Sequence, residues 1–281
     1  MRVEFIPLLQ CQRDLHGLPR GMERFRAYLR TIANKDGTGL DLPSLVIMNP
    51  MGNDHVTALL DELLAIDADG IAARVLEEVG GDLQSEPGDF KAALVIADDL
   101  KGGWTNRYAT EFTLRFPSGG PKPEKIRPPK WTKHFWLNGV LWSSEPVSER
   151  AVREAILTAL YRAVYLQRNG AARTLREMMA QEGFVMAQAG CAGPELDEED
   201  IEYTRAVIEP FLDAEDMRTA IERLFGDTPA RTLNFTPRGL SPWAGMALAL
   251  HDARSARKGM IRSSSAQLSA KILGQATVAE P

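Results

Sequence analysis

Two short, uninterrupted apolar runs constrain the fold of this chain more than any other feature. They lie at residues 45–48 (LVIM) and 92–97 (AALVIA), and each ends in polar residues. Runs of this length without polar alternation are typical of strands buried on both faces. Between them, apolar residues recur at helical spacing over residues 56–64 and again over 71–79. We therefore expect a strand, helices, and a second strand parallel to the first, with a right-handed connection.

Other segments extend this pattern. Residues 3–9 are predicted to form a short strand or an extended lead-in, residues 11–20 are too broken for regular structure, and His134 to Trp142 is the third strand candidate. Five prolines between Pro117 and Thr132 exclude regular structure, so this segment is predicted to be a surface loop. Helices are predicted over 20–34, from Asn53 or Asp54, from near Thr105 or Asn106, from Ser148, over 171–189, from Asp197, from Asp213, and from Ser241 through His251.

The fold class that follows is α/β, with a small, mostly parallel sheet in the N-terminal half covered by a helical C-terminal half. We expect a single domain over residues 1–254, with strands and crossover helices to about residue 146 and a helical part over 147–254. Residues 255–281 lack a sustained apolar stripe and are predicted to form a disordered tail.

The composition of the 281 residues excludes several classes of protein. Hydrophobic residues make up 44% of the chain, which is typical of a soluble globular protein, and no segment approaches the length of a membrane helix. The first residues do not resemble a signal peptide, and the cysteines Cys11 and Cys191 fit reduced thiols, so we expect a cytoplasmic protein. No nucleotide-cofactor motif of the GxGxxG or GxxxxGK[ST] type is present.

Charge is segregated along the chain, although the net charge is only −5. Residues 195–227 carry 12 acids and 3 bases, whereas residues 117–134 and residues 253–281 each carry 5 bases and 1 acid. The net negative charge argues against bulk nucleic-acid binding, which depends on phosphate neutralisation. The basic loop follows directly on the best candidate site, so we expect an anionic ligand there.

That candidate site follows the second apolar run. Asp98 and Asp99 stand at its carboxyl end, where parallel sheets bind their ligands, and a glycine pair and a helix start come next. Asp98, Asp99 and Glu111 could act as acids or bases or bind a divalent cation. Asn106 and Arg107 could orient an anionic substrate. The alternative is turn chemistry, with Arg107 and Glu111 forming a helical ion pair.

Histidines and a tryptophan elsewhere could complete this site. His16 lies in an irregular segment, His251 lies on the last helix among small residues, and Trp104 lies in a loop where it could stack on a ligand. His55, in the first turn of a predicted helix, is a second candidate that would open on the same sheet edge, but capping alone explains its neighbours. No local spacing typical of a zinc site is present, so any metal remains unspecified.

Two hypotheses about function stay open. The first is an enzyme acting on a small polar, anionic molecule through the loop carboxylates at the strand end. The second is a non-catalytic binding or accessory protein whose acidic helical surface and basic proline-rich loop contact a partner protein.

Overall fold

The computed structural model describes residues 1–100, 106–117 and 134–257. Two compact units are distinguished, Met1–Ala171 and a second that begins at Ala172. The first unit holds a small parallel sheet with helices, and the described part of the second consists of helices and loops. The predicted α/β class is confirmed, whereas one domain across residues 1–254 remains a prediction.

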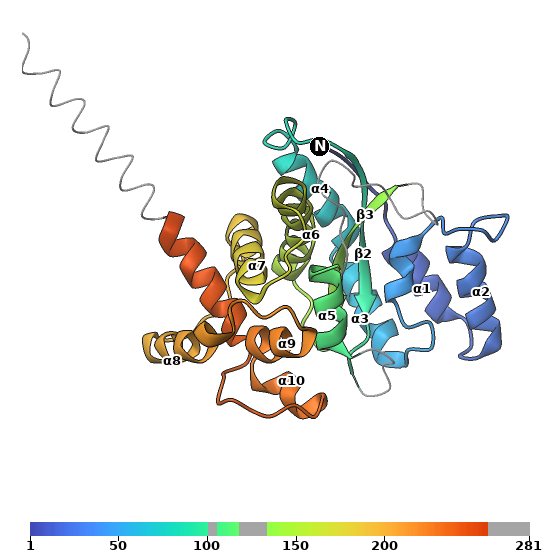
Figure 1. The fold of residues 1–281 in the computed structure, drawn as a ribbon. Helices are drawn as coiled ribbons and strands as arrows, with labels where there is room; N and C mark the ends of the chain where they lie inside the picture. The colour runs from blue at the N-terminus through green and yellow to red at the C-terminus, as the bar shows by residue number, and fades with distance from the viewer. Residues whose placement is uncertain (101–105, 118–133, 258–281) are drawn as a thin grey trace, which may run out of the picture. The chain divides into compact units, whose positions relative to one another are not determined.

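The sheet has three parallel strands in the order β1 (Arg2–Phe5), β2 (Asp89–Ala97) and β3 (Phe135–Trp142) (Figure 1). The register places Phe5 beside Ala92 and Ala97 beside Trp142. As the central strand, β2 is covered on both faces and paired on both edges, and residues 92–97 are all buried. This explains its uninterrupted apolar run. The strands predicted from the sequence at 92–97 and 134–142 are confirmed.

The strand predicted at residues 45–48 is wrong. This segment forms η1 (Pro43–Ile47), a 3-10 helix, and β1 takes the place beside β2 that this strand was expected to fill. The apolar run is explained by burial, because Leu45 and Met48 pack in one cluster with Ala93 and Val95 of β2. An apolar run predicts burial, but it does not by itself distinguish a strand from a buried turn of helix.

The prediction of irregular structure over residues 11–20 is also wrong over most of its length. Residues of this segment belong to α1 (Leu9–Gly17), which packs against α3 and β2. Its polar Gln12 is buried because the side-chain amide donates to the Leu94 carbonyl (3.1 Å) and accepts from the Ile96 amide (3.0 Å). A buried face built on hydrogen bonds leaves no apolar stripe in the sequence.

The connection from β1 to β2 then continues through helices that the sequence predicted. These are α2 (Met22–Ile32), α3 (Asp54–Ala65) and α4 (Ala68–Gly80). The buried side chains of α2 are Arg24, Tyr28 and Ile32, whereas the apolar side chains of Met22 and Leu29 are exposed.

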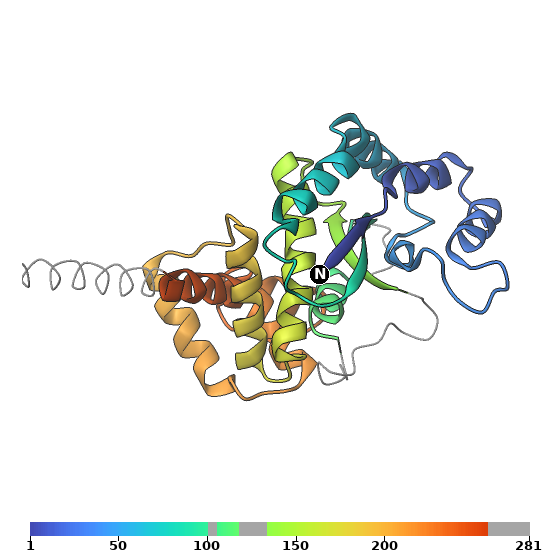
Figure 2. The same cartoon turned by 90° about the horizontal axis from the view of Figure 1, so that it is seen from above.

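The two faces of the sheet are covered by different elements. Figure 2 shows α1 and α2 on one side and α6 (Glu149–Asn169), which begins at the predicted cap Ser148, on the other. Alternate residues of β2 face opposite sides, so Ala93 and Val95 contact the η1 side while Leu94 lies against Gly139 near α6. A Cβ at Gly139 would lie 2.8 Å from a Leu94 methyl and 3.4 Å from Cα of Ile156 in α6.

The segment between β2 and β3 is described in part. The predicted helix there is α5 (Arg107–Arg115), capped by Asn106, whose side chain accepts from the Ala109 amide at 3.1 Å. Trp104 and nearly all of the predicted basic loop lie outside the described residues.

The second unit contains α7 (Leu175–Ala189), α8 (Glu198–Ile208), η3 (Glu209–Phe211), α9 (Met217–Phe225), α10 (Asp227–Thr232) and a helix over residues 244–257. The starts predicted at Asp197 and near Ser241 are close to those observed, whereas α9 is capped by Asp216 and not by Asp213. The last helix includes residues 255–257 of the predicted tail, and residues 258–281 lie outside the described part. No helix of the described residues is long and apolar enough to cross a membrane.

The close approach at Gly139 generates a stability prediction. Gly139→Ala should lower the free energy of unfolding by about 1–3 kcal/mol, because the new methyl overpacks Leu94. The matched control is Gly80→Ala at the end of α4, where nothing lies within 4 Å of the new Cβ. It should raise stability by about 0.5–1 kcal/mol, since alanine favours helix over glycine. Urea denaturation of both variants measures the difference, and equal effects would contradict the packing described.

Candidate functional site

The side chain of Asp98 is the centre of a hydrogen-bond network at the carboxyl end of β2. Its relative exposure is 1%, and it accepts hydrogen bonds from three other segments of the chain. Nε2 of His55 lies 2.8 Å from Oδ1, the Ser143 hydroxyl donates to Oδ1 at 2.8 Å, and the Asn49 amide donates to Oδ2 at 3.3 Å. A carboxylate removed from water is stabilised by such donors. Asp98 therefore joins the end of β2 to the start of α3 and to the residue that follows β3.

The loop before α3 is folded so that His55 reaches this carboxylate. The Asn49 side-chain oxygen accepts from the Met51 amide at 3.0 Å, and its carbonyl accepts from the Gly52 amide at 3.0 Å. A Cβ at Gly52 would lie 2.9 Å from Val56 and 3.1 Å from the ring of His16. Only glycine fits there without displacing a neighbour, and His55 then lies in the first turn of α3.

The hydrogen bond to Asp98 defines the chemistry of the His55 ring. A carboxylate accepts, so Nε2 carries a hydrogen, and in the neutral ring Nδ1 then keeps the lone pair. In the described part of the chain Nδ1 makes no hydrogen bond, and 30% of the side chain is exposed. A buried carboxylate that orients a partly exposed imidazole is an arrangement that can accept and return a proton.

His16, predicted to complete the site, lies close to this pair in the last turn of α1. Its ring is buried, and Nδ1 lies 3.4 Å from Nη1 of Arg24. Burial, reinforced by the Arg24 charge, lowers the pKa of His16 to about 4, and Asp98 opposes this change in part. The imidazole is therefore neutral near pH 7, with Nδ1 accepting from the guanidinium.

Arg24 holds His16 and the loop before α3 together. Its guanidinium donates to the carbonyls of Leu18 (2.8 Å), His16 (3.1 Å) and Gly52 (3.2 Å). The first two follow or end α1, where carbonyl groups have no partner within the helix. Arg24 is thus a positioning residue. The sequence did not mark it, because a charged side chain on an amphipathic helix is expected on the exposed face, whereas Arg24 shares the buried face of α2 with Tyr28 and Ile32.

Asp99 belongs to a second network next to Asp98. Its carboxylate accepts from the backbone amide (3.0 Å) and the hydroxyl (2.7 Å) of Ser144, and from Nη1 of Arg107 (3.3 Å). The Ser143 hydroxyl, which bonds Asp98, lies 3.2 Å from Oδ1 of Asp99. The loop after β3 therefore contacts both aspartates.

Arg107 is engaged by three carboxylates. Besides Asp99, it pairs with Glu145 and with Glu111 (3.4 Å), and its guanidinium stacks 5.0 Å from the ring centre of Trp142. Burial alone lowers the pKa of Arg107, but Glu145, Glu111 and Asp99 more than offset this and raise it. The guanidinium orients the carboxylates around it, and it could reach an anionic substrate only by exchanging one of them.

The remaining predicted site residues are distributed between this edge and other parts of the chain. Glu111 is buried and pairs with Arg107 and with Arg115 (2.7 Å), and Asn106 caps α5. His251 is exposed on the last helix of the second unit, and Trp104 lies outside the described residues. Asp98, Asp99, Arg107 and Glu111 are therefore linked through shared contacts in the first unit.

A metal ligand set is not formed by these groups. Within residues 1–100, 106–117 and 134–257, no group of three or more histidine, cysteine, aspartate or glutamate side chains is placed to hold a metal ion. The carboxylates of Asp98, Asp99 and Glu111 are directed instead to the hydrogen-bond donors described above.

Comparison with known proteins adds little to this picture. No known protein family and no solved structure matches the chain. Over 81 residues the chain is 35% identical to the uncharacterized protein YjfC of Bacillus subtilis (strain 168). The match covers 29% of this chain and 27% of that protein, so the chain spans about a quarter of its relative.

The network around Arg107 generates a second stability prediction. Arg107→Leu should lower the free energy of unfolding by about 3 kcal/mol, because it leaves the buried carboxylate of Asp99 without its counter-charge and removes one of the two arginines that pair with Glu111. Arg150→Leu is the control, since Arg150 and Glu154 form an exposed helical pair that contributes less than about 0.5 kcal/mol. Urea denaturation compares the two, and equally small losses would show that Arg107 does not hold this edge together.

The environment of His16 generates a prediction about pH. The unfolded chain protonates this ring below about pH 6.5, and the folded chain does so only below about pH 4. Between these values the unfolded state binds more protons, so acidification destabilises the fold. From pH 7 to pH 4, the wild type should lose about 3 kcal/mol more of its unfolding free energy than a His16→Gln variant. Denaturation at several pH values tests this, and identical pH dependence of the two proteins would contradict it.

Proposed function

We propose that this protein is an enzyme that transfers a proton to or from a small polar, anionic molecule bound at the carboxyl end of β2. His55 is the group that exchanges the proton, and Asp98 orients its ring. The observation that carries the proposal is the 2.8 Å contact between Nε2 of His55 and the buried carboxylate of Asp98. The sequence predicted Asp98, Asp99 and Glu111 as acids or bases. In this proposal His55 exchanges the proton in their place.

The purely structural alternative, in which the pair only ties α3 to β2, explains less of the geometry. Asn49 and Ser143 already donate to Asp98 and already connect these segments. The histidine adds an acceptor nitrogen without a partner in the described part of the chain, at the sheet edge where parallel sheets bind ligands. Proton transfer by a histidine so oriented contributes about 10²–10⁴ in rate.

The anionic character of the substrate rests on the charge of the segment that follows α5 in the sequence. The segment after α5, residues 117–134, carries 5 basic residues and 1 acidic residue. The neighbouring helix start of α5 adds amide groups whose dipole favours an anion. A phosphorylated or carboxylated small molecule is the class that both features favour.

The test uses the full chain and a defined library of small phosphorylated and carboxylated compounds, with mass spectrometry to follow consumption. We expect the wild type to consume at least one compound, and His55→Gln to slow that reaction by about 10²–10⁴. Asp98→Asn should slow it as well, because an amide can present its NH₂ group to Nε2 and so select the other tautomer.

The matched control is Asp54→Asn, the residue preceding His55, which makes no hydrogen bond to the Asp98 network. It should leave the rate unchanged, and circular dichroism should show every variant folded. A wild type that consumes no compound, or a His55→Gln variant of undiminished rate, would overturn the proposal. The first result would favour the accessory-protein hypothesis, in which the acidic residues 195–227 contact a partner.

A further inference from the structure

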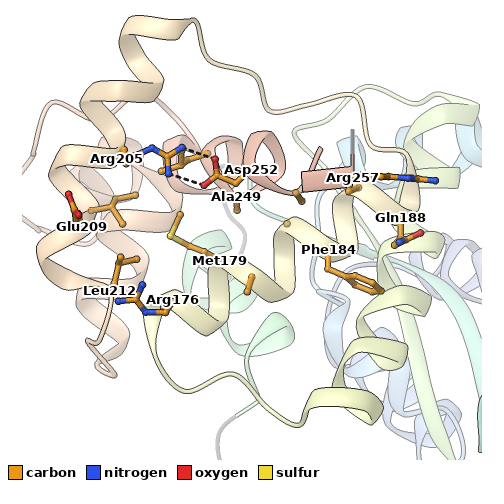
Figure 3. A pocket seen from close by; sticks show the side chains of 16 residues that line it. Arg176, Met179, Phe184, Gln188, Arg205, Glu209, Leu212, Ala249, Asp252 and Arg257 are labelled. Atoms are coloured by element: carbon orange, nitrogen blue, oxygen red, sulfur yellow. Dashed lines mark hydrogen bonds and ion pairs between the residues drawn. The ribbon is translucent and has the colours of Figure 1, made fainter. Parts of the chain in front are cut away.

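The second unit contains a cavity that the proposed function does not use. Its volume is about 730 Å³, within the range of about 300–1,000 Å³ usual for small-molecule pockets. It lies between α7, the α8–η3 segment and the helix over residues 244–257 (Figure 3). Met179, Phe184 and Leu248 are among the apolar residues that line it.

Small residues of α7 open this cavity beside a close helix contact. A Cβ at Gly183 would lie 2.5 Å from the Ala249 carbonyl, so α7 and the last helix touch at this point. Ala180 and Ala187, three residues before and four after Gly183, lie on the same side of α7 and also line the cavity. Since their side chains are short, the space between the helices is not filled by α7 itself.

Charged groups stand around this apolar space, and most of them are neutralised. Arg205 forms two hydrogen bonds with Asp252, at 3.0 and 2.7 Å, and Arg176 pairs with Asp213 at 3.3 Å. Arg257 differs, because within the described residues it makes no ion pair. Figure 3 shows Arg257 next to Gln188 at one end of the cavity, whereas the acidic Glu209 lies at the other end.

We infer that this cavity binds an amphipathic anion, namely an unbranched alkyl chain that ends in a single carboxylate. The alkyl chain lies along Met179, Ala180 and Leu248, and the carboxylate binds the guanidinium of Arg257 with the Gln188 amide as a second donor. An apolar interior that ends in a cation without an ion pair among the described residues is complementary to this class of ligand. The inference is independent of the proton-transfer site, since the cavity is formed by the second unit alone.

Isothermal titration calorimetry of the full chain with octanoate and decanoate tests the inference. We expect saturable binding at one site and an affinity about fourfold higher for each added methylene, the effect of burying a CH₂ group. Decanol should bind about tenfold more weakly than decanoate, because it lacks the charge that pairs with Arg257, and decyltrimethylammonium should bind more weakly still.

Two variants separate the apolar and the charged part of the site. Ala180→Trp fills the cavity from a position with an exposed side chain and should abolish binding of both decanoate and decanol. Arg257→Gln should weaken decanoate about tenfold and leave decanol unchanged. Arg231→Gln is the control, because Arg231 is exposed on α10 and does not line the cavity.

Equal affinity for decanoate and decanol in the wild type would overturn the inference, since it would show no recognition of charge. Undiminished binding to Ala180→Trp, with the variant folded by circular dichroism, would overturn it as well. Loss of proton-transfer activity in the His55→Gln variant with decanoate binding intact is expected, so the two proposals fail or stand separately.

Discussion

The buried carboxylate of Asp98 is the interaction on which the first unit's functional edge depends. Removing a carboxylate from water is costly, and the cost is offset only where several donors reach it. Here the donors come from Asn49, His55 and Ser143, which belong to separate segments of the chain. The need to satisfy one charge thus brings an imidazole and a serine hydroxyl to the same carboxylate oxygen at the end of β2.

Neighbouring residues carry this organisation outward. Ser143 donates a hydrogen bond to Asp98 and also contacts Asp99. Asp99 pairs with Arg107, and Arg107 pairs in turn with Glu111 of α5. In this network the carboxylates predicted to be catalytic have different surroundings. Asp98 orients a partly exposed histidine, whereas Asp99 and Glu111 are bound by donors of the protein itself.

Much of the fold was predictable because β2, β3 and the long helices are encoded locally. The run at residues 92–97 and the spacing in α3 and α6 describe buried strands and one-sided helices directly. The run at residues 45–48 was wrongly predicted to be a strand, because a segment that packs against the face of a sheet and a strand within the sheet can have the same apolar sequence. Helix α1 was not predicted, because Gln12 on its buried face is polar and is held there by hydrogen bonds.

The site was predictable to the same extent and for related reasons. The rule that ligands bind at the carboxyl ends of parallel strands led to Asp98 and Asp99. The register of β3 could have led to Ser143, since Trp142 pairs with Ala97 and the next residues must lie side by side. The sequence also offered His55 as a second candidate at this edge. Its contact with Asp98, like the role of Arg24, depends on how η1 and α2 pack, which no local pattern records.

The proposed role of His55 depends on Asp98, which holds the neutral ring with hydrogen on Nε2 and a lone pair on Nδ1. Nitrogen-15 NMR of the histidine ring, recorded on the full chain near neutral pH, reads the tautomer directly. We predict a protonated Nε2 and an unprotonated Nδ1 for neutral His55, and loss of this preference in Asp98→Asn. A ring that carries its hydrogen on Nδ1, or that samples both tautomers equally in the wild type, would contradict it.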